Sequence, residues 1–181
     1  MVKIYTRTGD AGDTGLLGEV RVRKNALRIE ACGAVDELNA AVGVAAAALQ
    51  DADLRDLLHS LQRQLLAIGA HLGDVRSDPG TLPEKMRLGP DHVSALERAI
   101  DTCEAELTPL QSFLLPGGCE AGARLHVART VCRGAERRVV ALAEHEAVPP
   151  VILAYLNRLS DLLFVLARVA NRRAGVSEIP W

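Results

Sequence analysis

Apolar side chains recur at helical spacing along most of this chain. Between residues 51 and 75, leucine and isoleucine recur every three or four positions, as they do on the buried face of an α-helix. The same spacing predicts a helix over residues 91–107, with Asp91 as its N-cap and Pro109 just beyond its end. An alanine-rich run predicts a further helix over residues 31–49, in which small side chains allow a neighbouring helix to approach closely.

Two more helices are expected in the second half of the chain. One follows a loop at residues 110–118 and runs to about residue 145, and the other begins at Pro149 and Pro150 and runs to about residue 173. Residues 76–90 hold three prolines and two glycines, which is typical of a surface connection. Five helices with short connections predict an all-α, five-helix up-and-down bundle with a ferritin-like four-helix core.

Length and composition favour one helical domain. The chain has 181 residues, and we expect a single domain over residues 1–181, with an extended segment at 1–25 and the bundle at 26–175. Hydrophobic residues make up 49% of the chain but aromatic residues only 3%, so the core must consist of leucine, valine, isoleucine and alanine. That composition suits interlocking helices better than a β-sheet.

The first residues of the chain do not follow the helical pattern. Residues 6–18 are polar, and glycine occupies every third position among threonines and aspartates: Gly9, Gly12, Gly15 and Gly18. One interpretation is a disordered tail, which is common at chain ends. We favour a ligand-binding loop, because a backbone without Cβ atoms can approach an anion closely. Threonine hydroxyls, Arg7 and Lys24 add donors that suit phosphate.

Net charge and cysteine spacing narrow the function classes. A net charge of −2 argues against a general nucleic-acid binder, although a few convergent donors would suffice for one specific anion. The four cysteines show no CxxC spacing and indicate reduced thiols in a cytoplasmic protein. The apolar run at residues 40–49 is too short to cross a bilayer, so no membrane partner is expected. The sequence contains no P-loop, HExxH motif or histidine pair with metal-ligand spacing.

Four charged residues fall on one stripe of the predicted fourth helix: Arg129, Arg133, Glu136 and Arg137. The stripe could be an ordinary solvated face on which Glu136 pairs with its neighbours. It could equally be a phosphate clamp, because guanidinium groups donate pairs of hydrogen bonds to phosphate oxygens. Composition alone leaves both interpretations open.

Polar residues also interrupt apolar stretches in two other helices. Asn157, Asp161 and Arg168 share one face of the fifth helix, where they either contact a partner helix or line a site. Asp36 lies in an apolar part of the first helix. A buried aspartate needs a cation, and Arg129 is a candidate for that role.

Phe113 is one of only two phenylalanines, and it lies in an apolar loop that ends in Pro-Gly-Gly. A loop phenylalanine usually covers the edge of a core. In a chain with so few aromatic side chains, Phe113 could instead face a flat ligand.

Five segments, taken together, resemble the PduO-type ATP:cob(I)alamin adenosyltransferases over nearly the whole chain. They are residues 5–10 (YTRTGD) with Gly12 and Thr14, 33–39 (GAVDELN), 113–118 (FLLPGG), 128–137 (ARTVCRGAER) and 155–161 (YLNRLSD). Five ordered motifs are far more specific than one glycine-rich loop.

The resemblance implies a homotrimer whose active sites lie between adjacent subunits. It implies that ATP binds to the N-terminal segment and to the helical body, through Thr6, Arg7, Thr8, Gly9, Thr14, Lys24, Arg133, Glu136, Arg137 and Asn157. It also implies an ion pair of Asp36 with Arg129 across the subunit interface, and Phe113 as the aromatic side chain under the corrin ring.

One position departs from the family pattern. The family commonly has two consecutive arginines after the cysteine, whereas here Arg133 is followed by Gly134. A glycine within a helix costs about 1 kcal/mol relative to alanine, and a donor is lost. We therefore expect weaker ATP binding than is usual in the family.

The implied reaction transfers the 5′-deoxyadenosyl group of ATP to the cobalt of cob(I)alamin and releases triphosphate. ATP and cobalamin are then substrates, Mg²⁺ arrives on the ATP phosphates, and the protein itself needs no metal ligands. Transient partners would be a cob(II)alamin reductase and an adenosylcobalamin-dependent enzyme. Two alternatives remain: a non-catalytic adenosylcobalamin carrier, and a nucleotide-responsive regulatory trimer.

Overall fold

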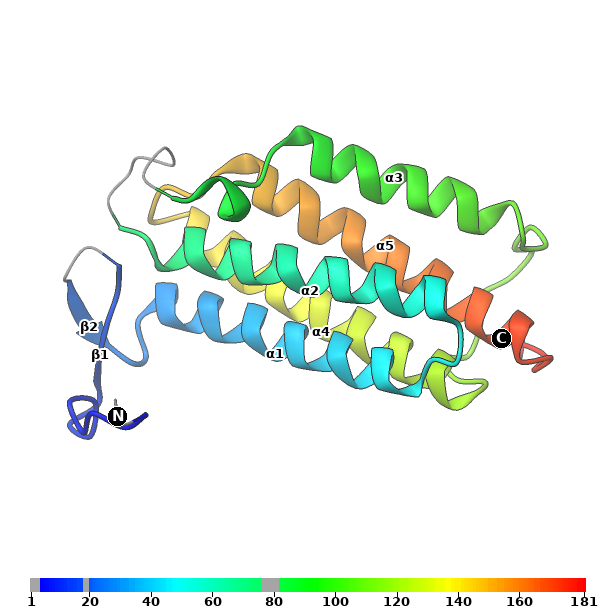
Figure 1. Ribbon diagram of the computed structural model, residues 1–181, viewed down its shortest axis with the longest axis horizontal. Helices are drawn as coiled ribbons and strands as arrows, with labels where there is room; N and C mark the ends of the chain where they lie inside the picture. Colours follow the sequence, from blue (N-terminus) through cyan, green and yellow to red (C-terminus); the bar gives the residue numbers. More distant parts are fainter. Residues whose placement is uncertain (1–3, 18–19, 76–81) are drawn as a thin grey trace.

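The computed structural model describes residues 4–17, 20–75 and 82–181. Gly18 and residues 76–81 of the expected connection lie outside the described residues. Figure 1 shows a long bundle of α-helices with a small β-hairpin beside one end. The elements in chain order are β1 (Asp13–Gly15), β2 (Arg21–Arg23), α1 (Leu27–Ala48), α2 (Ala52–Gly73), the 3₁₀ turn η2 (Glu84–Met86), α3 (Pro90–Glu104), α4 (Glu120–Ala143) and α5 (Pro150–Arg173). The predicted all-α, five-helix bundle is confirmed.

The helices pack in a simple order that places α4 and α5 side by side. α1 contacts α2 and α4, α4 contacts α5, and α3 lies on α5 (Figure 1). Their facing surfaces form one core of leucine, valine, isoleucine and alanine, as the composition predicts. α1 and α5 are long and apolar enough to cross a membrane by length and composition alone, but much of each is buried within this bundle.

Three helix ends differ from their approximate predicted positions, and for two of them the structure gives a local reason. α1 begins at Leu27, four residues earlier than predicted. α2 ends at Gly73 because the next residues leave the helix and bond to Leu17, with the Leu17 N–H donating to the carbonyl of Gly73 at 2.9 Å. α3 ends at Glu104, because the following residues form tighter turns.

The predicted N-cap of α3 is also wrong. Gly89 is the N-cap, Pro90 is the first helical residue, and Asp91 already lies inside the first turn. Proline favours this first position because its fixed φ suits the helix and its missing N–H is not needed there. The Nδ1 atom of His92 accepts the hydrogen bond of the Gly89 N–H at 3.1 Å, which closes the start of the helix.

The described part of the N-terminal segment is an antiparallel hairpin beside the end of the bundle where α1 begins (Figure 1). Thr14 of β1 pairs with Val22 of β2. Leu17 forms a bridge to Asp74, just after α2, and this contact ties the hairpin to the bundle. These residues therefore form local structure, which favours the loop interpretation over a featureless tail.

Candidate functional site

The glycine-rich loop is folded back on itself by backbone hydrogen bonds. The N–H of Gly12 donates to the carbonyl of Gly9 at 3.2 Å, and the N–H of Lys24 donates to the carbonyl of Gly12 at 2.9 Å. Gly12 has φ +88°, a conformation that favours glycine. A Cβ atom at Gly9 would lie 3.3 Å from Nζ of Lys24, so glycine lets the lysine lie against the loop.

Arg7 adopts a backbone conformation that is unusual for a residue with a side chain. Its φ is +61°, and it is the sole described non-glycine residue with positive φ. Such a conformation costs about 1–2 kcal/mol and is found most often at functional sites. The side chain of Arg7 lies over the ring of Tyr5, 5.5 Å from its centroid, and stays exposed.

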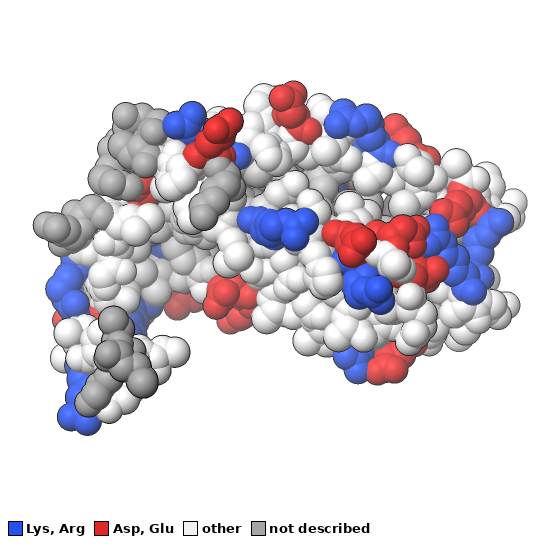
Figure 2. All heavy atoms as spheres, in the orientation of Figure 1, with Lys and Arg blue, Asp and Glu red and all other residues white. Residues whose placement is uncertain are grey.

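The predicted nucleotide residues of this segment are mostly open to solvent. Thr6, Arg7, Thr8 and Lys24 are exposed, and Gly9 and Thr14 are half-buried. The hydroxyls of Thr6 and Thr8 lie 2.9 Å apart, and Arg21 donates to the carbonyl of Thr8 at 2.7 Å. Figure 2 shows basic side chains over this end of the molecule. The loop is thus preformed and presents its donors outward.

On α4, the predicted arginine stripe lies on the surface and faces α5. Arg129 is half-buried and Arg133 and Arg137 are exposed. Among the described residues, neither Arg133 nor Arg137 forms an ion pair. Glu136 accepts a hydrogen bond from Nδ2 of Asn157 on α5 at 3.0 Å and does not pair with the arginines. The expected pairing of Glu136 with its neighbours is therefore not seen among the described residues, and the exposed Arg133 and Arg137 are compatible with either a solvated face or a phosphate clamp.

Arg129 lies in an environment that disfavours its charge. Its Nε atom is buried and has no hydrogen-bond partner. Burial lowers the pKa of Arg129, and the neighbouring positive charge of Arg133 lowers it further. An anion placed beside these two side chains would relieve both effects.

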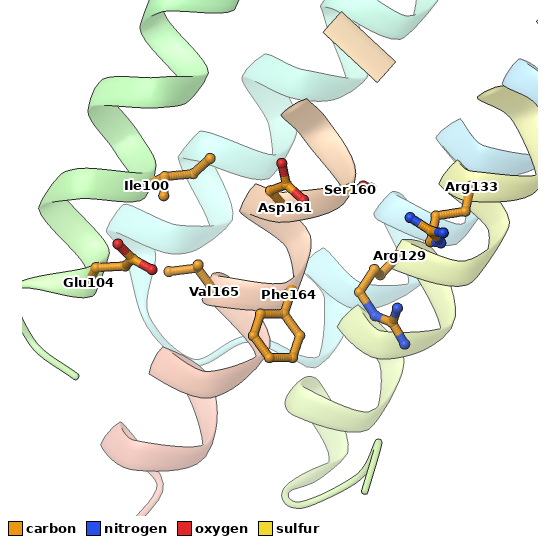
Figure 3. Close-up of a pocket in the computed structure, with 8 residues that line it drawn as sticks. All are labelled: Ile100, Glu104, Arg129, Arg133, Ser160, Asp161, Phe164 and Val165. Carbon is orange, nitrogen blue, oxygen red and sulfur yellow. The ribbon is translucent and has the colours of Figure 1, made fainter. Parts of the chain in front are cut away.

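A cleft of about 330 Å³ opens beside Arg129 and Arg133. Figure 3 shows its walls, with the two arginines on α4 facing Asp161 and Phe164 on α5, and α3 closing the far side. Carboxylate and guanidinium groups thus line the same groove. The carboxylate of Asp161 is already paired with Arg158 at 3.1 Å.

The three polar residues predicted to share a face of α5 have separate roles in the structure. Asn157 bonds to Glu136, and Asp161 pairs with Arg158. Arg168 is buried, and its guanidinium donates to Glu178 at 3.1 Å and to the carbonyl of Thr108 at 2.9 Å. Of the three, only Asn157 and Asp161 lie on the open surface.

Asp36 is not the buried aspartate that the sequence suggested. It is exposed on α1, and among the described residues it makes no ion pair with Arg129. Its apolar neighbours in sequence face the core, whereas Asp36 lies on the opposite side of the helix. The expected pair between subunits is not tested by a single chain.

Phe113 is strongly exposed, with 79% of its surface accessible to solvent. Its ring lies edge-on to that of Trp181, with centroids 6.3 Å apart. The backbone around it is held by the last residues of the chain, because the Trp181 N–H donates to the Phe113 carbonyl at 2.8 Å and the Leu115 N–H to the Ile179 carbonyl at 2.9 Å. Phe113 therefore does not cover a core edge. It belongs to an exposed apolar surface, of the kind that binds partners or ligands.

A second cleft, of about 380 Å³, lies beneath the Phe113 loop. Arg129 and Phe164 line both this cleft and the first one, so the two adjoin. His126 also lines it and is almost fully buried, with no partner for its Nδ1 atom. Burial lowers the pKa of His126, and the positive charge of Arg129 lowers it further, against a smaller opposing effect of Glu178. The site thus combines an apolar surface with a groove lined by two arginines and two carboxylates, Glu104 and Asp161.

The cysteines do not form a reactive centre. All four are free. Burial raises the pKa of Cys132 to about 12 and also raises those of Cys103 and Cys32, so these thiols are poor nucleophiles. Within the described ranges, no group of three His, Cys, Asp or Glu side chains could hold a metal ion.

Sequence reasoning missed Trp181 and the segment after α5 that carries it. The available signal was the scarcity of aromatic side chains, since this is the one tryptophan in the chain. It also missed His126, because nothing in sequence spacing distinguishes a histidine beside a cleft from any other histidine on a helix.

The two groups of predicted nucleotide residues lie apart within one chain. Among the described residues, the hydrogen bonds of residues 6–24 stay inside that segment, its junction with α1 and the end of α2. None reaches Arg133, Arg137 or Asn157. If both groups bind one ligand, a second subunit or a movement of the hairpin is needed.

Comparison with known proteins gives one consistent family. A family model for cobalamin adenosyltransferase matches residues 4–170. Corrinoid adenosyltransferase PduO of Salmonella typhimurium is 47% identical over 176 residues, which are 97% of this chain and 52% of that protein. The chain thus spans about half the length of this relative and of the similar protein from Citrobacter freundii. Corrinoid adenosyltransferase of Bacillus subtilis is 43% identical, over 99% of this chain and 92% of that protein.

Solved structures agree with the sequence comparison. A variant of the PduO-type ATP:corrinoid adenosyltransferase from Lactobacillus reuteri, complexed with cobalamin and ATP, superposes with a TM-score of 0.93 at 33% identity, covering 99% of both chains. A second variant of that protein, complexed with ATP, gives a TM-score of 0.91 at the same identity.

Proposed function

The chain belongs to the cobalamin adenosyltransferase family, and on that premise we propose that it transfers the 5′-deoxyadenosyl group of ATP to cob(I)alamin. One observation carries the proposal: an exposed aromatic platform at Phe113 adjoins a groove whose arginines, Arg129 and Arg133, form no ion pair among the described residues. A flat apolar macrocycle suits the platform, and a polyphosphate suits the groove.

ATP is held from two sides in this proposal. The hairpin supplies backbone N–H groups, threonine hydroxyls, Arg7 and Lys24, all of which are exposed and suited to phosphate. The helical body supplies Arg133 and Arg137, which form no ion pair among the described residues, and the Glu136–Asn157 pair. Mg²⁺ enters bound to the phosphates of ATP in this proposal.

The reaction needs no protein nucleophile. The cobalt of cob(I)alamin donates an electron pair to the 5′ carbon of ATP, the cobalt–carbon bond forms, and the carbon–oxygen bond breaks. The leaving triphosphate takes the electron pair of that bond. The protein orients the 5′ carbon and stabilises the leaving charge through Arg133, Arg137 and Lys24. The high pKa values of the buried thiols are compatible with a reaction in which no cysteine acts as the nucleophile.

Phe113 acts on the corrinoid in this proposal. Its ring lies against the lower face of the macrocycle and excludes water and the corrinoid's own base from the cobalt. Loss of that axial ligand makes the reduced, nucleophilic state accessible. Phe113 can play this part because it projects from the surface instead of packing into the bundle.

The active protein is proposed to be a homotrimer with sites between subunits. Asp36 is exposed on α1 and forms no ion pair among the described residues, while Arg129 is half-buried and carries a charge that its surroundings disfavour. An ion pair of Asp36 with the guanidinium of Arg129 of a neighbouring subunit would offset that cost. Exposed valines on α1 and α4, Val44, Val127 and Val140, supply apolar surface for the same association.

We place the protein in the cytoplasm, where a cob(II)alamin reductase and an adenosylcobalamin-dependent enzyme would be its transient partners. Two other functions remain distinct hypotheses: a carrier that binds adenosylcobalamin without making it, and a regulatory trimer that responds to nucleotide.

An anaerobic assay with ATP, Mg²⁺ and chemically reduced cobalamin separates these functions. The enzyme consumes the cob(I)alamin absorption band and forms adenosylcobalamin and triphosphate in equal amounts. A carrier binds added adenosylcobalamin but consumes no cob(I)alamin, and a nucleotide-responsive regulator binds ATP alone. Loss of the band without triphosphate release would contradict the proposed reaction.

A further inference from the structure

Asn171 is a buried polar residue near the end of α5, and both polar atoms of its side chain form hydrogen bonds with the backbone of residues 117–119. Only 2% of its surface is exposed. Its Oδ1 atom accepts the N–H of Cys119 at 2.9 Å, and its Nδ2 atom donates to the carbonyl of Gly117 at 3.1 Å. A buried amide that satisfies two backbone groups is costly to replace, because water does not reach them.

Two glycines make room for this amide. A Cβ atom at Gly118 or at Gly122 would lie 2.2 Å from Oδ1 of Asn171, well inside contact distance. Gly118 also has φ +103°, which a residue with a side chain rarely adopts. The loop, the first turn of α4 and Asn171 are therefore fitted to one another.

The backbone of Asn171 also anchors the residues after α5, which in turn bond to the Phe113 loop. Its carbonyl accepts the N–H of Val176 at 2.9 Å, which turns the chain back after α5. The returning residues then bond to the backbone of Phe113 and Leu115. The Phe113 loop is thus tied to the end of α5 at two places, at Gly117 and Cys119 through the side chain of Asn171, and at Phe113 and Leu115 through the segment that follows α5.

The ring of Phe113 has no core contacts of its own to fix it, since most of its surface is exposed. Its position must come from the backbone that carries it. We propose that Asn171 is a positioning residue that sets the place of Phe113 relative to the bundle. Its effect on turnover rests on the proposed adenosyl transfer, whereas its effect on the loop does not.

The first test replaces the amide with Asn171→Ala. We expect faster hydrogen exchange at the Cys119 amide and a changed emission of Trp181, the single tryptophan and the ring neighbour of Phe113. We expect kcat to fall at least about tenfold while KM for ATP changes less than about twofold. Val169→Ala, which opens a cavity at a fully buried site on the same helix, is the matched control for lost stability. It should lower Tm without the split between kcat and KM.

The second test uses the fit between Gly122 and Asn171. Gly122→Ala should destabilise the protein and slow turnover, although alanine normally favours a helix over glycine. In the Asn171→Ala background the clash is absent, so the same change should raise Tm. An equal effect of Gly122→Ala in both backgrounds would overturn the proposal, as would unchanged Cys119 exchange in Asn171→Ala.

These measurements distinguish failure of the positioning role of Asn171 from failure of the proposed adenosyl transfer. Exchange and fluorescence need no substrate. If the wild-type protein forms no adenosylcobalamin but Asn171→Ala loosens the loop, the proposed function fails and the positioning role stands. If the wild-type protein is active and Asn171→Ala retains full kcat, the positioning role is wrong.

Discussion

The N-terminal hairpin and the Phe113 loop both carry exposed side chains to which the proposed function assigns ligand contacts, but the fold holds them very differently. The hairpin is tied to the bundle at Leu17 and through its junction with α1, and its own hydrogen bonds are mostly internal. The Phe113 loop is bonded at several backbone positions, through Asn171 and through the segment after α5. A segment that must wrap and release a nucleotide benefits from freedom, whereas an aromatic platform must stay in place. This difference predicts that the hairpin governs substrate binding and the loop governs turnover.

The largest effect is expected from removing the platform itself. Phe113→Ala should lower turnover of cob(II)alamin with a reductant at least about 100-fold, equivalent to about 2.7 kcal/mol, because the cobalt keeps its lower ligand. ATP affinity, measured by calorimetry, should hardly change. Ile179→Ala, also an exposed apolar residue beside this loop, is the control and should retain activity. Unchanged turnover in Phe113→Ala would refute the role of the ring.

The hairpin should give the opposite kinetic pattern. Replacing Arg7 and Lys24 together by alanine removes two charge-assisted contacts to phosphate, and KM for ATP should rise about 100-fold. The free energy of unfolding should change by less than about 0.5 kcal/mol, since both side chains are exposed. Arg23→Ala is the matched control, because Arg23 is an exposed base of the same hairpin that pairs with Asp13. A fall in kcat with constant KM would contradict the comparison.

A third measurement asks whether α1 of one subunit pairs with α4 of the next, as is required for sites between subunits. Asp36→Ala and Arg129→Ala should each weaken trimer formation in analytical ultracentrifugation, and the double variant should be no worse than the more damaging single one. The expected coupling is about 1–3 kcal/mol. Glu37→Ala, at the exposed neighbour of Asp36, serves as the control. Additive effects of the two single variants would rule out the pair.

Acidification should destabilise the folded protein through two histidines whose pKa values are lowered by burial. Burial lowers the pKa of His126, so the unfolded chain binds a proton that the native protein excludes. The contribution of His126 is complete above about pH 6.5 and is lost as the pH falls toward its lower folded pKa. His71 has the same sign, because burial lowers its pKa as well.

Urea unfolding at pH 7.5 and 5.5 measures this loss. His126→Gln should reduce the difference in unfolding free energy between the two pH values. A pH difference identical to that of the wild type would show that His126 is not excluded from protonation. Hydrogen bonds from Arg173 lower the pKa of the Asp53 and Glu106 carboxyl groups. Their contribution to stability is therefore lost only at a lower pH than that of the two histidines.

The smallest effect concerns Gly134, which departs from the family pattern. Beyond the backbone of α4 itself, the described atoms nearest to a Cβ atom built there are the flexible ends of Arg138 and Arg137, at 3.7 and 3.9 Å. Gly134→Arg should stabilise α4 by about 1 kcal/mol and tighten ATP binding a few-fold. Gly134→Ala is the control, which should reproduce the gain in stability alone. Equal ATP affinity in both variants would show that a donor at this position has no use.

Hydrophobic periodicity determined the number, type and approximate extent of the helices, because a helix must bury one face and its sequence records which one. The scarcity of aromatic side chains was enough to single out Phe113, and the pattern of glycine and threonine marked the hairpin. Helix ends were predicted less accurately, because backbone groups outside the helix form hydrogen bonds with the residues at its end, as Leu17 does at the end of α2.

Only the tertiary structure decided what depends on residues far apart in the chain. Asp36 is exposed because α2 and α4 cover the other side of α1, which its own neighbours do not reveal. Trp181 lies beside Phe113, and Asn171 closes the loop at Gly117, because the chain turns back after α5. Local sequence sets which side chains can face a core, but contacts between distant segments appear only when the packed helices bring them together.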